Sequence, residues 1–134
     1  MSAERATYLD SSALVKLVVR EPESAALRGY LRRGRRTLVS SSLARVEVRR
    51  ALAPLGAHAV TRGTEVLARV NLIRVSDRVL DVAAMLPSAE LRSLDAIHLA
   101  TASQLGASLA RVVTYDERMA GAAQALGWTV AAPA

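Results

Sequence analysis

The chain alternates between short apolar runs and longer stretches in which apolar residues recur at helical spacing. Runs with the length and composition of buried strands cover residues 6–9, 37–40, 72–75, 111–115 and 128–130. The stretches between them predict helices over residues 11–19, 23–33, 42–55, 57–70, 77–86, 93–106 and 117–126. This order is typical of a parallel sheet covered by helices on both faces. We therefore expect an α/β fold with a mainly parallel central sheet of four to five strands.

The composition is that of a folded protein. A length of 134 residues fits one domain, residues 1–134, and 51% of the residues are hydrophobic against 22% charged. The absence of cysteine excludes disulfides, thiolate nucleophiles and zinc–thiolate sites. No apolar stretch approaches the ~20 residues of a membrane span, and residues 1–5 lack a signal-peptide pattern. We expect a cytoplasmic protein without membrane contact.

Four acidic residues lie among neighbours that belong in a core. Asp10 and Asp116 each follow a predicted strand, Glu47 lies between two valines, and Asp95 lies in the first turn of a predicted helix. Carboxylates are rarely buried without a partner, because their desolvation is costly. In a parallel sheet, the strand ends and the helices that follow them meet at one edge. The four acids can therefore reach one shared pocket.

A pocket of clustered carboxylates needs positive charge. Two carboxylates about 4 Å apart repel by about 4 kcal/mol at an effective dielectric near 20, and Mg²⁺ or Mn²⁺, which prefer oxygen ligands, would relieve that repulsion. Such a site can hydrolyse a phosphodiester. Each acid also has an ordinary alternative. Asp10 and Asp116 could cap helices, Asp95 could be a first-turn acid that the helix dipole favours, and Glu47 could pair with Arg49 or Arg50.

The net charge of +6 and the pI near 11.0 favour a polyanionic partner, either nucleic acid or an acidic protein. A coding bias toward arginine would give the same balance. Only four aromatic residues are present, so RNA or DNA contacts should be mainly to the backbone. Arg45, Arg49 and Arg50 share a predicted helix with Glu47 and are candidate contacts for phosphate or a partner protein. The basic turn over residues 32–36 is a solvated loop or a weaker phosphate candidate.

The acids stand in four motifs that together resemble one family. Residues 8–17 (Tyr-Leu-Asp-Ser-Ser-Ala-Leu-Val-Lys-Leu) resemble the first motif of PIN-domain ribonucleases, particularly VapC-type toxins of type II toxin–antitoxin systems. Residues 42–47 are similar to the second motif, residues 94–102 to the third and residues 113–119 to the fourth. Any single motif is weak, but the four occur in order over nearly the whole chain.

This resemblance implies a three-layer α/β/α sandwich and a Mg²⁺-dependent endoribonuclease, with Mn²⁺ as a possible substitute. It also implies inhibition by a small VapB-type antitoxin and a homodimer. The residues that match the family's metal ligands are Asp10 and Asp95, with Asp116 as a direct or water-mediated ligand. Glu47 matches the residue that supports the metal or orients the attacking water.

The resemblance adds two supporting residues, because Ser11 and Thr114 match positions that hydrogen-bond within the acidic cluster. His98 follows Asp95 by three residues and could be an acid or base, but a packed or surface histidine is the more common outcome. Two other classes stay open at this point. One is a catalytically silent PIN scaffold that binds RNA or protein. The other is a nuclease or phosphatase of another acid-cluster fold, although the Asp-x-Asp motif of haloacid-type phosphatases is absent at residues 10–12.

Overall fold

A computed structural model describes residues 5–34, 36–87 and 90–134 of the chain. Its centre is a five-stranded sheet in the order β3-β2-β1-β4-β5, and every neighbouring pair of strands is parallel. The strands are β1 (Ala6–Leu9), β2 (Thr37–Ser41), β3 (Asn71–Ile73), β4 (Leu109–Val113) and β5 (Val130–Ala131). The predicted parallel sheet of four to five strands is confirmed.

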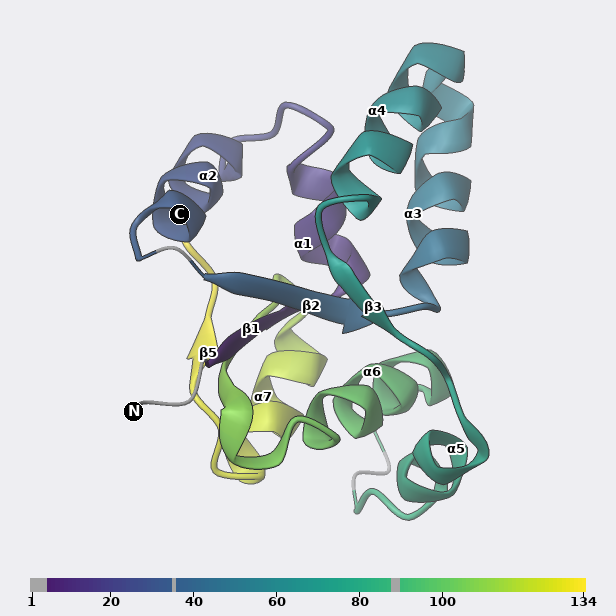
Figure 1. The fold of residues 1–134 in the computed structure, drawn as a ribbon, viewed down its shortest axis with the longest axis vertical. Coiled ribbons are helices and arrows are strands. Elements are labelled where there is room, and N and C mark those ends of the chain that lie inside the picture. Colours follow the sequence, from purple (N-terminus) through teal and green to yellow (C-terminus); the bar gives the residue numbers. More distant parts are fainter. Residues whose placement is uncertain (1–4, 35, 88–89) are drawn as a thin grey trace.

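Helices cover both faces of the sheet, as the alternation predicts (Figure 1). One layer holds α1 (Ser11–Lys16), α2 (Ser24–Arg32), α3 (Ala44–Leu52) and α4 (Ala57–Leu67). The other layer holds α5 (Asp77–Ala84), α6 (Ser93–Ser103) and α7 (Glu117–Ala125). Two short 3₁₀ helices, η1 (Ala53–Leu55) and η2 (Gly106–Ser108), complete the described part of the chain. The three-layer α/β/α sandwich is confirmed.

The central strand β1 contributes side chains to the hydrophobic clusters on both faces of the sheet. Leu9 packs into the cluster on the α1–α3 side with Leu14 and Val48, whereas Tyr8 packs with Val112 on the α6 side. Successive side chains of a strand point to opposite faces, so adjacent residues serve different layers. Both Tyr8 and Leu9 are fully buried. The end of β1 is therefore fixed from both sides.

Several helix ends differ from the sequence-based expectation. The sequence predicts a third helix from a Ser42 cap through Leu55, but α3 ends at Leu52 and η1 follows, with Pro54 in its first turn. Proline lacks the amide donor that an α-helix needs at that point. The Ser42 hydroxyl instead accepts from the backbone N–H of Val75. The sequence also predicts that Asp77 caps a helix through Leu86, but α5 ends at Ala84 and its cap is Ser76, whose hydroxyl accepts from the N–H of Val79.

The strand order reverses beside β1. The chain first builds β2 and β3 on one side of β1 and then returns to place β4 and β5 on the other side. Ligands of open α/β sheets bind beyond the strand ends at such a reversal. Asp10 directly follows β1, and Asp116 follows β4 by three residues. No helix in the described residues is long and apolar enough to span a membrane.

Candidate metal and substrate site

Asp10 is the most deeply buried of the four acids, with 2% of its surface exposed. It caps α1, and its Oδ1 accepts from the Ala13 N–H (3.0 Å) and the Ser12 hydroxyl (2.6 Å). Its Oδ2 accepts from the Thr114 hydroxyl at 2.6 Å. Burial raises the pKa of Asp10, although these hydrogen bonds oppose the shift. The helix-cap alternative thus holds, and it does not exclude a metal role, because a carboxylate offers about four acceptor sites.

Asp116 stands opposite Asp10 across the end of β4. It caps α7 through Oδ1, which accepts from the N–H groups of Arg118 (2.9 Å) and Met119 (3.2 Å). Its own N–H donates to the Thr114 hydroxyl, so Thr114 connects the two strand-end acids directly. The second carboxylate oxygen, Oδ2, accepts no hydrogen bond from the described residues.

Asp95 lies in the first turn of α6 and makes no hydrogen bond or ion pair with any described residue. Burial raises the pKa of Asp95, and the charges of Asp116, Asp10 and Glu47 raise it further, with only His98 lowering it. These causes place the other three acids within electrostatic reach of Asp95. Among the described residues, the carboxylate of Asp95 therefore has no bonded partner.

Glu47 lies in the first turn of α3, which belongs to the helix layer on the other side of the sheet from α6. Its Oε1 accepts from the Ser11 hydroxyl at 2.7 Å and lies 2.6 Å from the Nε2 atom of His98. Burial alone would raise the pKa of Glu47, but the hydrogen bonds from His98 and Ser11 outweigh it and lower the pKa. Glu47 is thus ionised at neutral pH.

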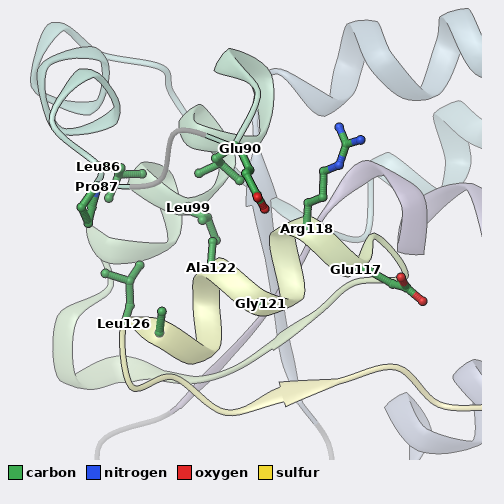
Figure 2. A pocket seen from close by; sticks show the side chains of 11 residues that line it. Leu86, Pro87, Glu90, Leu99, Glu117, Arg118, Gly121, Ala122 and Leu126 are labelled. Carbon is green, nitrogen blue, oxygen red and sulfur yellow. The ribbon is translucent and has the colours of Figure 1, made fainter.

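Three of the acids border one hollow of about 470 Å³. Its lining consists of Glu47, Arg92, Ser93, Leu94, Asp95, Asp116 and Arg118, and we call it the acidic hollow. Two exposed arginines from the starts of α6 and α7 thus stand at its border, and no carboxylate of the described residues forms an ion pair with either. Figure 2 shows Arg118 extending from the first turn of α7, away from the apolar side chains of Leu86, Leu99 and Leu126.

The donor chemistry of the acidic hollow fits a hard cation. Asp95 and Asp116 offer carboxylate oxygens that accept no hydrogen bond from the described residues. The pKa of Asp95 is raised by burial and then by the neighbouring acids, whose negative charge a cation would neutralise. Within the described residues, no group of three or more Asp, Glu, His or Cys side chains is arranged as a ready metal cage. An open arrangement of this kind suits Mg²⁺, which keeps several of its waters.

The arginines around the hollow are not those that the sequence singles out. Arg45, Arg49 and Arg50 are exposed on α3, and none of them is among the lining residues. Sequence reasoning misses Arg92 and Arg118, although each lies within three residues of a motif acid. In the basic turn, Arg36 stacks on the ring of Tyr30, and Arg35 lies outside the described residues. That turn enters β2 and so lies at the edge of the sheet opposite the acids.

His98 is the other residue whose role the sequence leaves undecided. It is 1% exposed and bonded on both ring nitrogens, so it is a packed histidine in direct contact with Glu47. The available signal is its spacing of three residues from Asp95, which places the two side chains on neighbouring parts of one helix. Its partner Glu47 could not be read from the sequence, since they are 51 residues apart.

The fold and the arrangement of acids are those of a nuclease-like α/β domain. The PIN domain model matches residues 7–125, and the chain belongs to the PIN domain family. Ribonuclease VapC46 of Mycobacterium tuberculosis is 59% identical over 128 residues, covering 96% of this chain and 98% of that protein. Ribonuclease VapC47 of the same species is 38% identical over 94% of this chain and 96% of that protein. The resemblance to VapC-type proteins is confirmed.

Solved structures agree with this fold. The sarcin–ricin loop cleaving toxin VapC20 of M. tuberculosis superimposes with a TM-score of 0.77 at 15% identity, covering 96% of this chain and all of that chain. A toxin–antitoxin complex from Klebsiella pneumoniae gives a TM-score of 0.72 at 23% identity, covering 96% and 98% of the two chains.

Proposed function

We propose that residues 1–134 form a single PIN domain that acts as a Mg²⁺-dependent endoribonuclease, the toxin of a toxin–antitoxin pair. The observation that carries this proposal is the acidic hollow, where Glu47, Asp95 and Asp116 share one border with two arginines that form no ion pair with a described carboxylate. Anionic oxygens suit a divalent cation, and guanidinium groups suit phosphate. Relatives named ribonucleases align in sequence with this chain over almost their whole length.

The residues divide the work by position. When bound, Mg²⁺ would polarise the phosphate and increase the acidity of a water. Asp95 and Asp116 would hold the ion together with the more deeply buried Asp10. The hydrogen bonds from Thr114 and Ser12 would keep the Asp10 carboxylate in place. Glu47 is ionised and can accept a hydrogen bond from the attacking water.

Arg92 and Arg118 are the residues best placed to hold the RNA strand. Both are exposed at the border of the acidic hollow, so their guanidinium groups can contact non-bridging phosphate oxygens while the carboxylates face the reacting phosphate. Contacts of this kind do not depend on sequence. The few aromatic residues in the chain agree with recognition through the backbone.

Cleavage of labelled RNA by the purified protein tests the proposal, with Mg²⁺ or with EDTA. We expect cleavage with Mg²⁺ that is lost with EDTA and falls at least a hundredfold in Asp95→Asn. Asp81→Asn, on α5 outside the lining of the hollow, is the matched control and should cleave at the wild-type rate. RNA binding without cleavage in the wild type would instead favour a silent scaffold.

We further propose a small VapB-type antitoxin as partner, a homodimeric toxin and a cytoplasmic location. An arginine of the antitoxin inserted into the acidic hollow would supply the charge that the cation otherwise supplies. The similar fold found in the Klebsiella toxin–antitoxin complex supports the pairing. Co-expression with a small protein from the adjacent reading frame should give an inactive complex that regains activity when the antitoxin is digested. An intact complex with full activity would contradict this.

A further inference from the structure

A buried chain of hydrogen bonds runs from the core to Glu47. The Tyr8 hydroxyl lies 2.6 Å from Nδ1 of His98, and Nε2 of His98 lies 2.6 Å from Oε1 of Glu47. The rings of Tyr8 and His98 pack edge to face, with centroids 5.9 Å apart. Tyr8 is fully buried and His98 is 1% exposed, so only the Glu47 end of the chain reaches solvent.

This chain joins the two helix layers across the sheet edge. Tyr8 lies on β1, within the sheet. His98 lies on α6, in the helix layer below the sheet in Figure 1, whereas Glu47 lies on α3, in the helix layer above the sheet. A glutamate at the start of an exposed helix would ordinarily sample several rotamers. Here a side chain from the other layer restricts it.

The ionisation of Glu47 fixes the direction of its hydrogen bond with His98. An ionised carboxylate accepts only, so the proton between Glu47 and His98 must lie on Nε2. When Nε2 alone carries a proton, Nδ1 accepts from the Tyr8 hydroxyl, and when both nitrogens carry one, Nδ1 donates to the Tyr8 oxygen. Burial raises the pKa of Tyr8 far above its usual range, which keeps that hydroxyl protonated.

Both donors meet the same oxygen of Glu47. Ser11 and His98 each bond to Oε1, and the Ser11 hydroxyl also lies 3.4 Å from Nε2 of His98. No described residue donates to Oε2, and Glu47 borders the acidic hollow. One carboxylate oxygen is therefore held by the protein, and the other is free for a ligand.

We propose that His98, held in turn by Tyr8, is a positioning residue of the hydrolytic site, which fixes the Glu47 carboxylate and leaves Oε2 available to the attacking water. This inference rests on the proposed function. It differs from a catalytic role for His98, because the buried imidazole reaches the hollow only through Glu47. It also assigns a purpose to a histidine that is almost fully buried.

Two substitutions of His98 separate positioning from packing. In His98→Gln the side-chain amide nitrogen reaches the place of Nε2 and can still donate to Glu47, whereas the shorter side chain of His98→Asn cannot. Loss of such an outer hydrogen bond typically costs 10- to 100-fold in activity. We expect His98→Asn to lower kcat about 10- to 100-fold with KM changed less than about threefold, and His98→Gln to retain kcat within about threefold.

A double-mutant cycle with Glu47→Gln tests whether His98 affects kcat through Glu47. If His98 acts through Glu47, adding His98→Asn to Glu47→Gln should lower kcat by less than about twofold further. Equal losses in the Asn and Gln variants, or full additivity in the Glu47→Gln background, would overturn the inference. Thermal unfolding of each variant identifies loss of fold. If His98→Asn does not fold, Tyr8→Phe replaces it in the cycle, and the same additivity rule applies.

A second measurement does not depend on activity. Nitrogen NMR of the His98 ring in the metal-free protein should find the proton on Nε2 and should show coupling or proximity to Glu47. A ring protonated on Nδ1 alone would overturn the inference even in an active enzyme. A wild-type protein that cleaves no RNA but carries the proton on Nε2 would contradict the proposed function alone and support the positioning of Glu47.

Discussion

Asp95, a candidate metal ligand, carries a charge that opposes stability. Its carboxylate has no hydrogen-bond or ion-pair partner among the described residues, and burial and the neighbouring acids raise its pKa. An acid whose pKa is higher in the folded state than in the unfolded state binds more protons when folded. Asp95 therefore lowers the free energy of unfolding as the pH rises from the pKa of its unfolded state through the higher pKa of its folded state.

We expect Asp95→Asn to stabilise the metal-free protein at neutral pH while it abolishes cleavage. The gain should be up to about 1 kcal/mol, since partly exposed charges are screened by solvent. It should vanish near about pH 3, where Asp95 is protonated in both states. Urea unfolding at neutral pH and at about pH 3 measures both values. A loss of stability at neutral pH would show that Asp95 has a favourable partner in the metal-free protein.

The contact between α3 and α4 depends on a glycine. A Cβ atom added at Gly63 would press against Cδ1 of Leu52 and touch Val48, and both of these side chains are fully buried. Nothing lies near a Cβ added at Gly29 in α2. The same substitution therefore has opposite consequences in two helices of one layer.

Gly63→Ala should lower the free energy of unfolding by about 1–2 kcal/mol, because overpacking exceeds the gain in helix propensity. Gly29→Ala is the matched control and should raise it by about 0.5–1 kcal/mol. Chemical denaturation of both variants measures the difference. Equal effects would mean that Leu52 moves aside at little cost.

Helices and strands are largely predictable from the chain, but their ends are not. Apolar periodicity indicates which segments are helical, as in the segment that forms α2, where one face is apolar and Leu27 is buried. The end of α3 differs from the prediction because Pro54 acts before the later stop signal at Gly56. The cap of α5 is ambiguous in the sequence because Ser76 and Asp77 are adjacent and both are good caps. When two neighbouring residues are both suitable as a cap or a stop signal, the backbone geometry decides between them, and the sequence pattern does not show that geometry.

The placement of the acids at one edge of the sheet follows from topology that the sequence implies. Parallel strands bring Asp10 and Asp116 together, and the helices that follow bring Glu47 and Asp95 near them. The contacts between layers do not follow, because nothing in the sequence pairs His98 with Glu47 or selects Arg118 over the α3 arginines. The sequence therefore predicts the edge of the sheet at which the acids gather, but not which other side chains contact them there.

The charge of the whole chain should appear in the salt dependence of RNA binding. Each arginine that neutralises a phosphate of single-stranded RNA adds about 0.7 to the slope of log affinity against log salt. Arg118→Gln and Arg92→Gln should each reduce the slope by about that amount in an Asp95→Asn background that does not cleave. Arg49→Gln, away from the acidic hollow, should leave it unchanged. A change only in Arg49→Gln would favour the α3 arginines as the phosphate contacts.

The account as a whole depends on a divalent cation in the acidic hollow. Anomalous diffraction from crystals soaked in Mn²⁺ tests this directly, because Mn²⁺ accepts the same oxygen ligands as Mg²⁺. The account predicts a Mn²⁺ peak bordered by Asp95 and Asp116 that is absent in crystals of Asp95→Asn. A hollow without Mn²⁺ in a protein that still cleaves RNA, or a peak elsewhere on the molecule, would contradict it.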